Sequence, residues 1–110
     1  MIIKNTNYYE TFSKRKWIGN PDARFLMEED LYRKYDIKSL SKEEIIDLLG
    51  GEDEQVCNEI RSSFQKNCKR DFIVLWLGRS EFSIKRYMVI IYEGNSVEDI
   101  KFIEKRFDPL

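Results

Sequence analysis

A change of hydrophobic pattern at residue 71 constrains the fold of this chain more than any other feature. Within DFIVLWLG (71–78), apolar residues follow one another without interruption and end at a glycine, as is typical of a strand buried in a sheet. Before this run the apolar residues recur at helical spacing, and after it β-branched and aromatic residues predominate. Helices followed by strands predict an α+β fold.

The first predicted helix spans residues 19–37. Asn20 is placed to cap this helix, and Pro21 suits its first position. The apolar residues recur at intervals of four, which predicts one buried side. The charged residues, including the cluster Glu28-Glu29-Asp30, are interpreted as a solvent-exposed face with favourable i,i+4 ion pairs.

The second predicted helix, SKEEIIDLLG (41–50), has both a start signal and a stop signal. Ser41 and Glu44 have the spacing of a capping box, in which each side chain binds the backbone of the other residue. Gly50 suits the left-handed position that follows a last helical turn. The stripe expected to be buried consists of Ile45, Ile46, Leu48 and Leu49.

The third predicted helix covers residues 54–68, with Asp53 as its cap, because its apolar residues again recur at intervals of four. The two cysteines of the chain, Cys57 and Cys68, fall on this helix. A helical rise of 1.5 Å per residue separates them by about 16 Å, whereas a disulfide needs Cα atoms within about 7 Å. We therefore expect two reduced, unlinked thiols.

Two further strands are predicted after the buried run. The segment IKRYMVIIYE (84–93) is rich in β-branched and aromatic residues. It leads into EGNS (93–96), a predicted hairpin turn in which Gly94 and Asn95 supply positive φ angles.

The last predicted strand, VEDIKFIEKR (97–106), is more charged than the others. Lys101 and Lys105 are typical of an exposed sheet edge, where charge discourages unwanted strand pairing. The sequence thus predicts one domain over residues 1–110, with two to three N-terminal helices packed on a three-stranded antiparallel meander.

The composition excludes several kinds of chemistry. The chain has no histidine, which removes the commonest general base, the commonest zinc ligand and every Ser-His or Cys-His nucleophile system. The sequence also lacks a phosphate-binding glycine loop and the ligand spacing of a zinc site. We expect a non-enzymatic protein that uses no cofactor and no metal.

Charge and hydropathy argue against binding to nucleic acid or membrane. With 19 basic and 20 acidic side chains the net charge is −1, whereas nucleic-acid-binding proteins usually carry a basic excess. The cations of SKRKW (13–17) are few, so Trp17 is expected to anchor the core rather than stack on a base. There is no apolar run of bilayer-spanning length and no signal peptide at the N-terminus, so we expect a cytoplasmic protein.

The strongest candidate for a binding site is an acidic stretch on and after the second predicted helix. Between residues 43 and 54 the sequence has no lysine or arginine. Its acidic residues are Glu43, Glu44, Asp47, Glu52, Asp53 and Glu54. Helix starts explain Glu43, Glu44 and Asp53, but they do not require the other three. We expect the stretch to bind another protein with a basic surface.

Four short motifs, RFLMEEDL, LSKEEIIDLLG, LWLG and IYEGNSV, lie in this order between residues 24 and 97. Together they resemble the SmpA/OmlA lipoprotein family, whose superfamily includes BamE-type outer-membrane proteins and the β-lactamase-inhibitor-like fold. The family's glycine before the helix is Ser39 here, its proline after the helix is Glu52, and the lipoprotein signal is absent, so membrane anchoring does not carry over. The resemblance implies a small two-layer α/β module that binds other proteins and catalyses nothing.

These features lead to one expected function and two alternatives. Small cytosolic domains with an acidic face often neutralise toxins whose nuclease domains are basic, and the inhibitor-like branch of the resemblance agrees by analogy. We therefore expect an immunity protein or inhibitor that neutralises a basic toxin or enzyme. The alternatives are a scaffold or assembly domain of the SmpA/OmlA type and a small enzyme. The sequence leaves the oligomeric state open.

Overall fold

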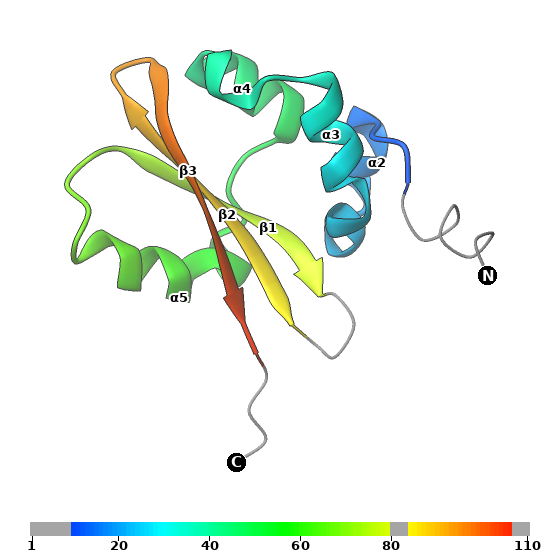
Figure 1. Ribbon diagram of the computed structural model, residues 1–110. Helices are drawn as coiled ribbons and strands as arrows, with labels where there is room; N and C mark the ends of the chain where they lie inside the picture. The colour runs from blue at the N-terminus through cyan, green and yellow to red at the C-terminus, as the bar shows by residue number, and fades with distance from the viewer. Residues whose placement is uncertain (1–9, 80–83, 107–110) are drawn as a thin grey trace.

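The computed structural model describes residues 10–79 and 84–106, and it confirms the α+β fold (Figure 1). Three strands form one antiparallel sheet in the order β1-β2-β3. They are β1 (Phe72–Arg79), β2 (Lys85–Glu93) and β3 (Ser96–Lys105), close to the predicted bounds. Among the strands that the structure describes, β1 and β3 are the two edges of the sheet.

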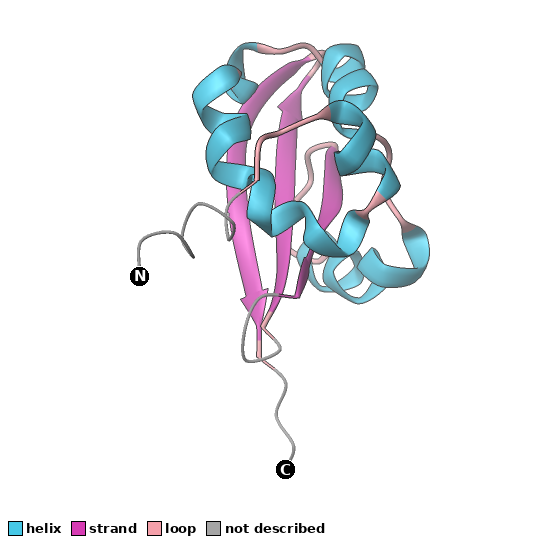
Figure 2. Cartoon of the chain, turned by 90° about the vertical axis from the view of Figure 1, so that its right-hand side faces the viewer, coloured by secondary structure: helices cyan, strands magenta, loops and turns pink. Residues whose placement is uncertain are grey.

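Helical segments precede β1 and lie on both sides of the sheet, with α5 on one face and the others on the opposite face (Figure 1, Figure 2). In chain order they are α2 (Lys14–Gly19), η1 (Pro21–Met27), α3 (Glu28–Lys34), η2 (Ile37–Ser39), α4 (Lys42–Leu49) and α5 (Glu54–Gln65), where η marks a 3-10 helix. Within the described residues, none of these helices is long and apolar enough to cross a bilayer.

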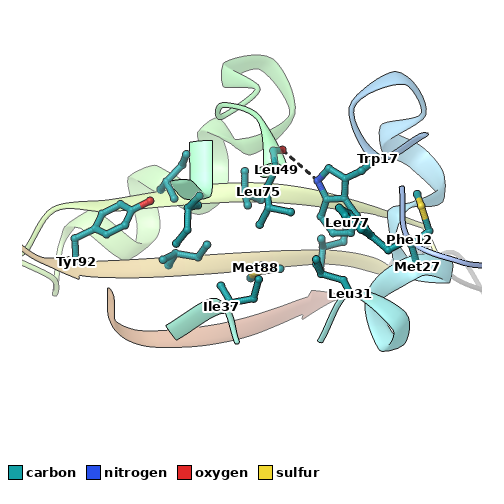
Figure 3. Close-up of a cluster of buried hydrophobic side chains, with 13 residues drawn as sticks. Phe12, Trp17, Met27, Leu31, Ile37, Leu49, Leu75, Leu77, Met88 and Tyr92 are labelled. Atoms are coloured by element: carbon teal, nitrogen blue, oxygen red, sulfur yellow. Dashed lines mark hydrogen bonds between the residues drawn. The ribbon is translucent and has the colours of Figure 1, made fainter. Parts of the chain in front are cut away.

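Each face of the sheet carries its own apolar cluster. On the face covered by α2, α3 and α4, Trp17 and Leu49 pack with Leu75 of β1, and the indole Nε1–H of Trp17 donates to the Leu49 carbonyl at 3.1 Å (Figure 3). On the α5 face, Cys57 packs with Val74. Burial from both sides explains why β1 is a continuous apolar run, whereas a strand with one face in water would alternate.

The local signals read from the sequence are confirmed at three turns. Ser41 and Glu44 form the predicted capping box, and Gly50 ends α4 with a φ of +84°. Asp53 caps α5 by accepting from the N–H groups of Gln55 and Val56. Gly94 forms the hairpin turn with a φ of +61°. These signals act within a few residues, so local chemistry is sufficient to fix them.

The two cysteines are unlinked, as expected. The third helix is shorter than predicted, because α5 ends at Gln65 and Cys68 lies beyond it. Cys57 is fully buried in the α5 cluster, whereas Cys68 is partly exposed.

The prediction of one continuous helix over residues 19–37 is wrong, because the segment divides into η1 and α3. The Asn20 side chain makes no capping hydrogen bond there. Instead, the backbone of η1 lies directly against Gly78 of β1, and Arg24 turns inward to bind backbone carbonyls of other elements. The contacts of η1 with other elements therefore determine the shape of this segment.

Two residues of the predicted helices lie on the opposite side from the one expected. Glu28 is only 7% exposed, and its carboxylate binds the Arg86 guanidinium through two hydrogen bonds of 2.9 and 2.7 Å. It is therefore no part of a solvated face. Ile46 was expected in the buried stripe of α4, but it is 46% exposed, because Ile45 and Leu49 alone face the centre of the core.

Candidate functional site

Three of the acidic residues expected to bind a partner accept hydrogen bonds from backbone N–H groups of other residues in the chain. The Glu44 carboxylate accepts from the Ser41 N–H at 2.8 Å, and the Asp53 carboxylate caps α5. Glu52 is 12% exposed and accepts two hydrogen bonds from Arg61, of 2.6 and 2.8 Å, and one from the Val74 N–H at 2.9 Å. The expectation that Glu52 lacks a structural role is therefore wrong.

Glu52 belongs to a group of side chains that closes the β1 edge of the sheet. Its carboxylate binds the outward N–H of Val74, and Arg61 donates to the outward carbonyl of Phe72 at 2.8 Å. Arg24 donates to the outward carbonyl of Trp76 at 2.9 Å. Each group would otherwise be free to pair with another strand. The three side chains thus replace the missing neighbour of β1.

Charge and packing support these contacts. The hydrogen bonds that Arg61 donates to Glu52 raise the pKa of the Arg61 guanidinium, which also lies 4.4 Å from the centre of the Phe72 ring. Arg24 is buried, which lowers the pKa of its guanidinium, and it also donates to the Trp17 carbonyl at 2.7 Å. Sequence reasoning missed this group, because its members are far apart in the chain and none belongs to a recognisable motif.

Replacing Glu52 with glutamine tests the role of this group. We expect the free energy of unfolding to fall by about 2–3 kcal/mol, because charge-assisted hydrogen bonds are lost and Arg61 is left without its counter-ion. Glu54→Gln makes the same chemical change at an exposed position and should stay within about 0.5 kcal/mol. Urea unfolding of both variants provides the measurement. Equal losses would show that Glu52 does not support β1.

All of the predicted site residues except Glu52 are exposed, and Glu43, Asp47 and Glu54 are the three that bind no backbone N–H group of another residue. Asp47 has a counter-ion that the local sequence did not reveal, because Lys14 of α2 reaches it at 3.2 Å. Hydrogen bonds from its own backbone N–H and from the Asn95 side chain lower the pKa of Glu43. Among the described residues, no hydrogen bond or ion pair involves the Glu54 carboxylate.

The exposed Ile46 lies among these carboxylates. It shares the outer side of α4 with Glu43 and Asp47, and it also lines a hollow of about 650 Å³ that Glu54 borders from the first turn of α5. We call Glu43, Ile46, Asp47 and Glu54 the α4 surface. An apolar side chain with charged neighbours has the composition of many protein-binding sites, in which an apolar centre is surrounded by polar groups.

Cys57 does not have the properties of a nucleophile. Burial, with a smaller contribution from the negative charge of Glu52, raises the pKa of its thiol to about 11. The thiol is therefore protonated at neutral pH, whereas the thiolate is the reactive form. Within the residues that the structure describes, no group of histidine, cysteine, aspartate and glutamate side chains could hold a metal ion.

Comparisons with known proteins assign no family to the chain. No protein-family model, no curated protein and no solved structure matches the chain.

Proposed function

We propose that the chain is a non-enzymatic protein-binding domain that inhibits a basic protein, such as a nuclease toxin, by docking the α4 surface on it. The observation that carries the proposal is the exposed Ile46, 46% accessible on a helix that also exposes Glu43 and Asp47 and whose one basic residue is Lys42. An apolar side chain in the centre can be desolvated on binding, while the carboxylates around it select a partner of opposite charge.

The α4 surface is suited to binding because both ends of its helix are fixed. The capping box holds the first turn and Gly50 ends the last, so Ile46 and Asp47 are presented on a helix with defined ends. A preorganised surface loses little side-chain and backbone freedom on association. An inhibitor of this kind would cover the basic surface with which a nuclease holds its substrate. We place this activity in the cytoplasm, where reduced cysteines are the rule.

Association kinetics with variants of the α4 surface test the proposal. A pull-down with the full chain supplies the partner, and surface-bound partner then measures association and dissociation rates. The double variant Asp47→Asn, Glu54→Gln should slow association about tenfold at low salt, because long-range attraction is lost. The difference should shrink at physiological ionic strength, where the Debye length is about 8 Å. Ile46→Ala should instead accelerate dissociation.

The matched control is the double variant Glu29→Gln, Asp36→Asn. It removes the same charge from exposed positions on other elements and should leave the rates unchanged. If the α4 variants and the control bind at the wild-type rate at every salt concentration, the α4 surface is not the binding site. A partner that is acidic, or an envelope-assembly protein, would favour the scaffold alternative over an inhibitor.

A further inference from the structure

The two edges of the sheet differ in how they are protected. Side chains of Arg24, Glu52 and Arg61 cover β1, whereas within residues 10–79 and 84–106 no strand pairs with the outer edge of β3 (Figure 1). An open edge presents backbone N–H and C=O groups that can pair with a further strand.

The hydrogen-bond pattern identifies the backbone groups of β3 that point away from the sheet. The Tyr92 N–H bonds to the Asp71 carbonyl at 2.9 Å, so alternate residues of β2 point toward β1 and the residues between them point toward β3. By the register of β2 with β3, the outward residues of β3 are Ile100, Phe102 and Glu104. The Ile100 N–H is consistent with this outward direction, because it donates to the neighbouring Asp99 carboxylate at 2.9 Å.

Apolar surface flanks this edge on both faces of the sheet. Among the described residues, Tyr32, Tyr35 and Phe102 are three of the five exposed large hydrophobic side chains, and all three line one hollow of about 520 Å³ beside β3. On the other face, a groove of about 1080 Å³ runs between α5 and β3 and includes Phe64 and Ile103. A strand added to β3 would therefore bury apolar side chains on both of its faces.

The charged residues of β3 are arranged so that two copies, paired antiparallel about Phe102, bring opposite charges together. When two copies pair antiparallel with Phe102 opposite Phe102, Asp99 of each copy lies opposite Lys105 of the other, and Lys101 lies opposite Ile103. Centring the pairing on residue 101 or 103 would instead bring Lys101 opposite Lys101 or Lys105. Centring it on Ile100 would run the pairing through the irregularity at Glu98, where the β2–β3 register shifts. The edge lysines thus disfavour pairing centred on residue 101 or 103, and they permit pairing centred on Phe102.

We propose that the chain forms a two-fold symmetric dimer through antiparallel pairing of the β3 edges, centred on Phe102, to give one continuous six-stranded sheet. The two-fold axis is perpendicular to the sheet, so each face continues into the same face of the other copy. The Phe102 side chains meet at the axis, beside Tyr32, whose ring already contacts Phe102 with centroids 5.9 Å apart. The dimer does not depend on the proposed function, because the α4 surface takes no part in it.

Sedimentation velocity over a concentration series, with charge-reversal variants of the full chain, tests the dimer and its register. Wild type should show a concentration-dependent dimer. Asp99→Lys and Lys105→Asp each place like charges opposite one another at two symmetric positions, so each should weaken the dimer about tenfold. The double variant restores opposite charges and should recover most of the wild-type affinity.

Two controls separate the interface from general effects of charge and folding. Arg15→Asp reverses one exposed charge on α2, whose contacts are with η1 and α4, and it should leave the dimer unchanged. Far-ultraviolet circular dichroism of every variant confirms that the fold is retained. A monomer at every concentration up to about 1 mM would overturn the proposal. A dimer that is indifferent to both single reversals, or that the double variant fails to restore, would overturn it as well.

Discussion

Replacing Gly78 with alanine is expected to lower the free energy of unfolding by about 4 kcal/mol, with roughly 1–3 from strained backbone and roughly 1–3 from overpacking. Gly78 has a φ of +105°, a conformation that side chains with a Cβ rarely adopt. A Cβ at this position would also overlap the backbone carbonyl of Asp22, which belongs to η1 and cannot move as a flexible side chain could. The β1–β2 register shifts beside Gly78, so this glycine also lies at a β-bulge.

Gly94→Ala is the matched control for this prediction. Gly94 also has a positive φ, +61°, but no atom lies within 4 Å of an added Cβ. We therefore expect the free energy of unfolding to fall by only about 1–2 kcal/mol, from backbone strain alone. Urea unfolding followed by circular dichroism compares the two variants with the wild type. Since a domain of this size has a total stability of about 5–15 kcal/mol, Gly78→Ala should be close to unfolding at moderate denaturant. Equal losses would show that η1 does not lie against β1.

Sequence reasoning succeeded where a structural feature depends on neighbouring residues. The three strands, the capping box of α4, the Asp53 cap and the Gly94 turn each depend on residues a few positions apart. Hydrophobic pattern and turn chemistry act at that range, so they are visible in the sequence.

The features that sequence reasoning missed depend on residues that only the fold brings together. Glu52 binds the Val74 N–H, and Glu28 binds Arg86 of β2, although the sequence suggests no connection between the members of either pair. The pattern of α4 also made Ile46 equivalent to Ile45, and only the direction of the sheet decided which one is buried. For the acidic stretch, composition identified six candidates, but the fold engages Glu44, Glu52 and Asp53 in hydrogen bonds with backbone N–H groups of other residues.

Leu49→Ala is the second change with a large expected effect. Leu49 is fully buried in the cluster that Trp17 and Leu75 share (Figure 3). Truncating a buried leucine removes its transfer free energy and leaves a cavity, so we expect a loss of about 2–5 kcal/mol. The hydrogen bond from Trp17 should survive, because it is accepted by the backbone carbonyl of Leu49, and tryptophan fluorescence in urea can follow unfolding.

Two exposed residues provide control variants for Leu49→Ala. Ile46→Ala changes a residue on the same helix, but Ile46 is 46% exposed, and alanine is the better helix former, so the loss should be below about 1 kcal/mol. Lys105→Ala removes an exposed edge charge and should change stability by less than about 0.5 kcal/mol. If Ile46→Ala costs as much as Leu49→Ala, the orientation of α4 is different from the one described, and Ile46 belongs to the core. If the fold tolerates Ile46→Ala, the residue is free to serve binding, and a loss of partner affinity in that variant can be attributed to the contact itself.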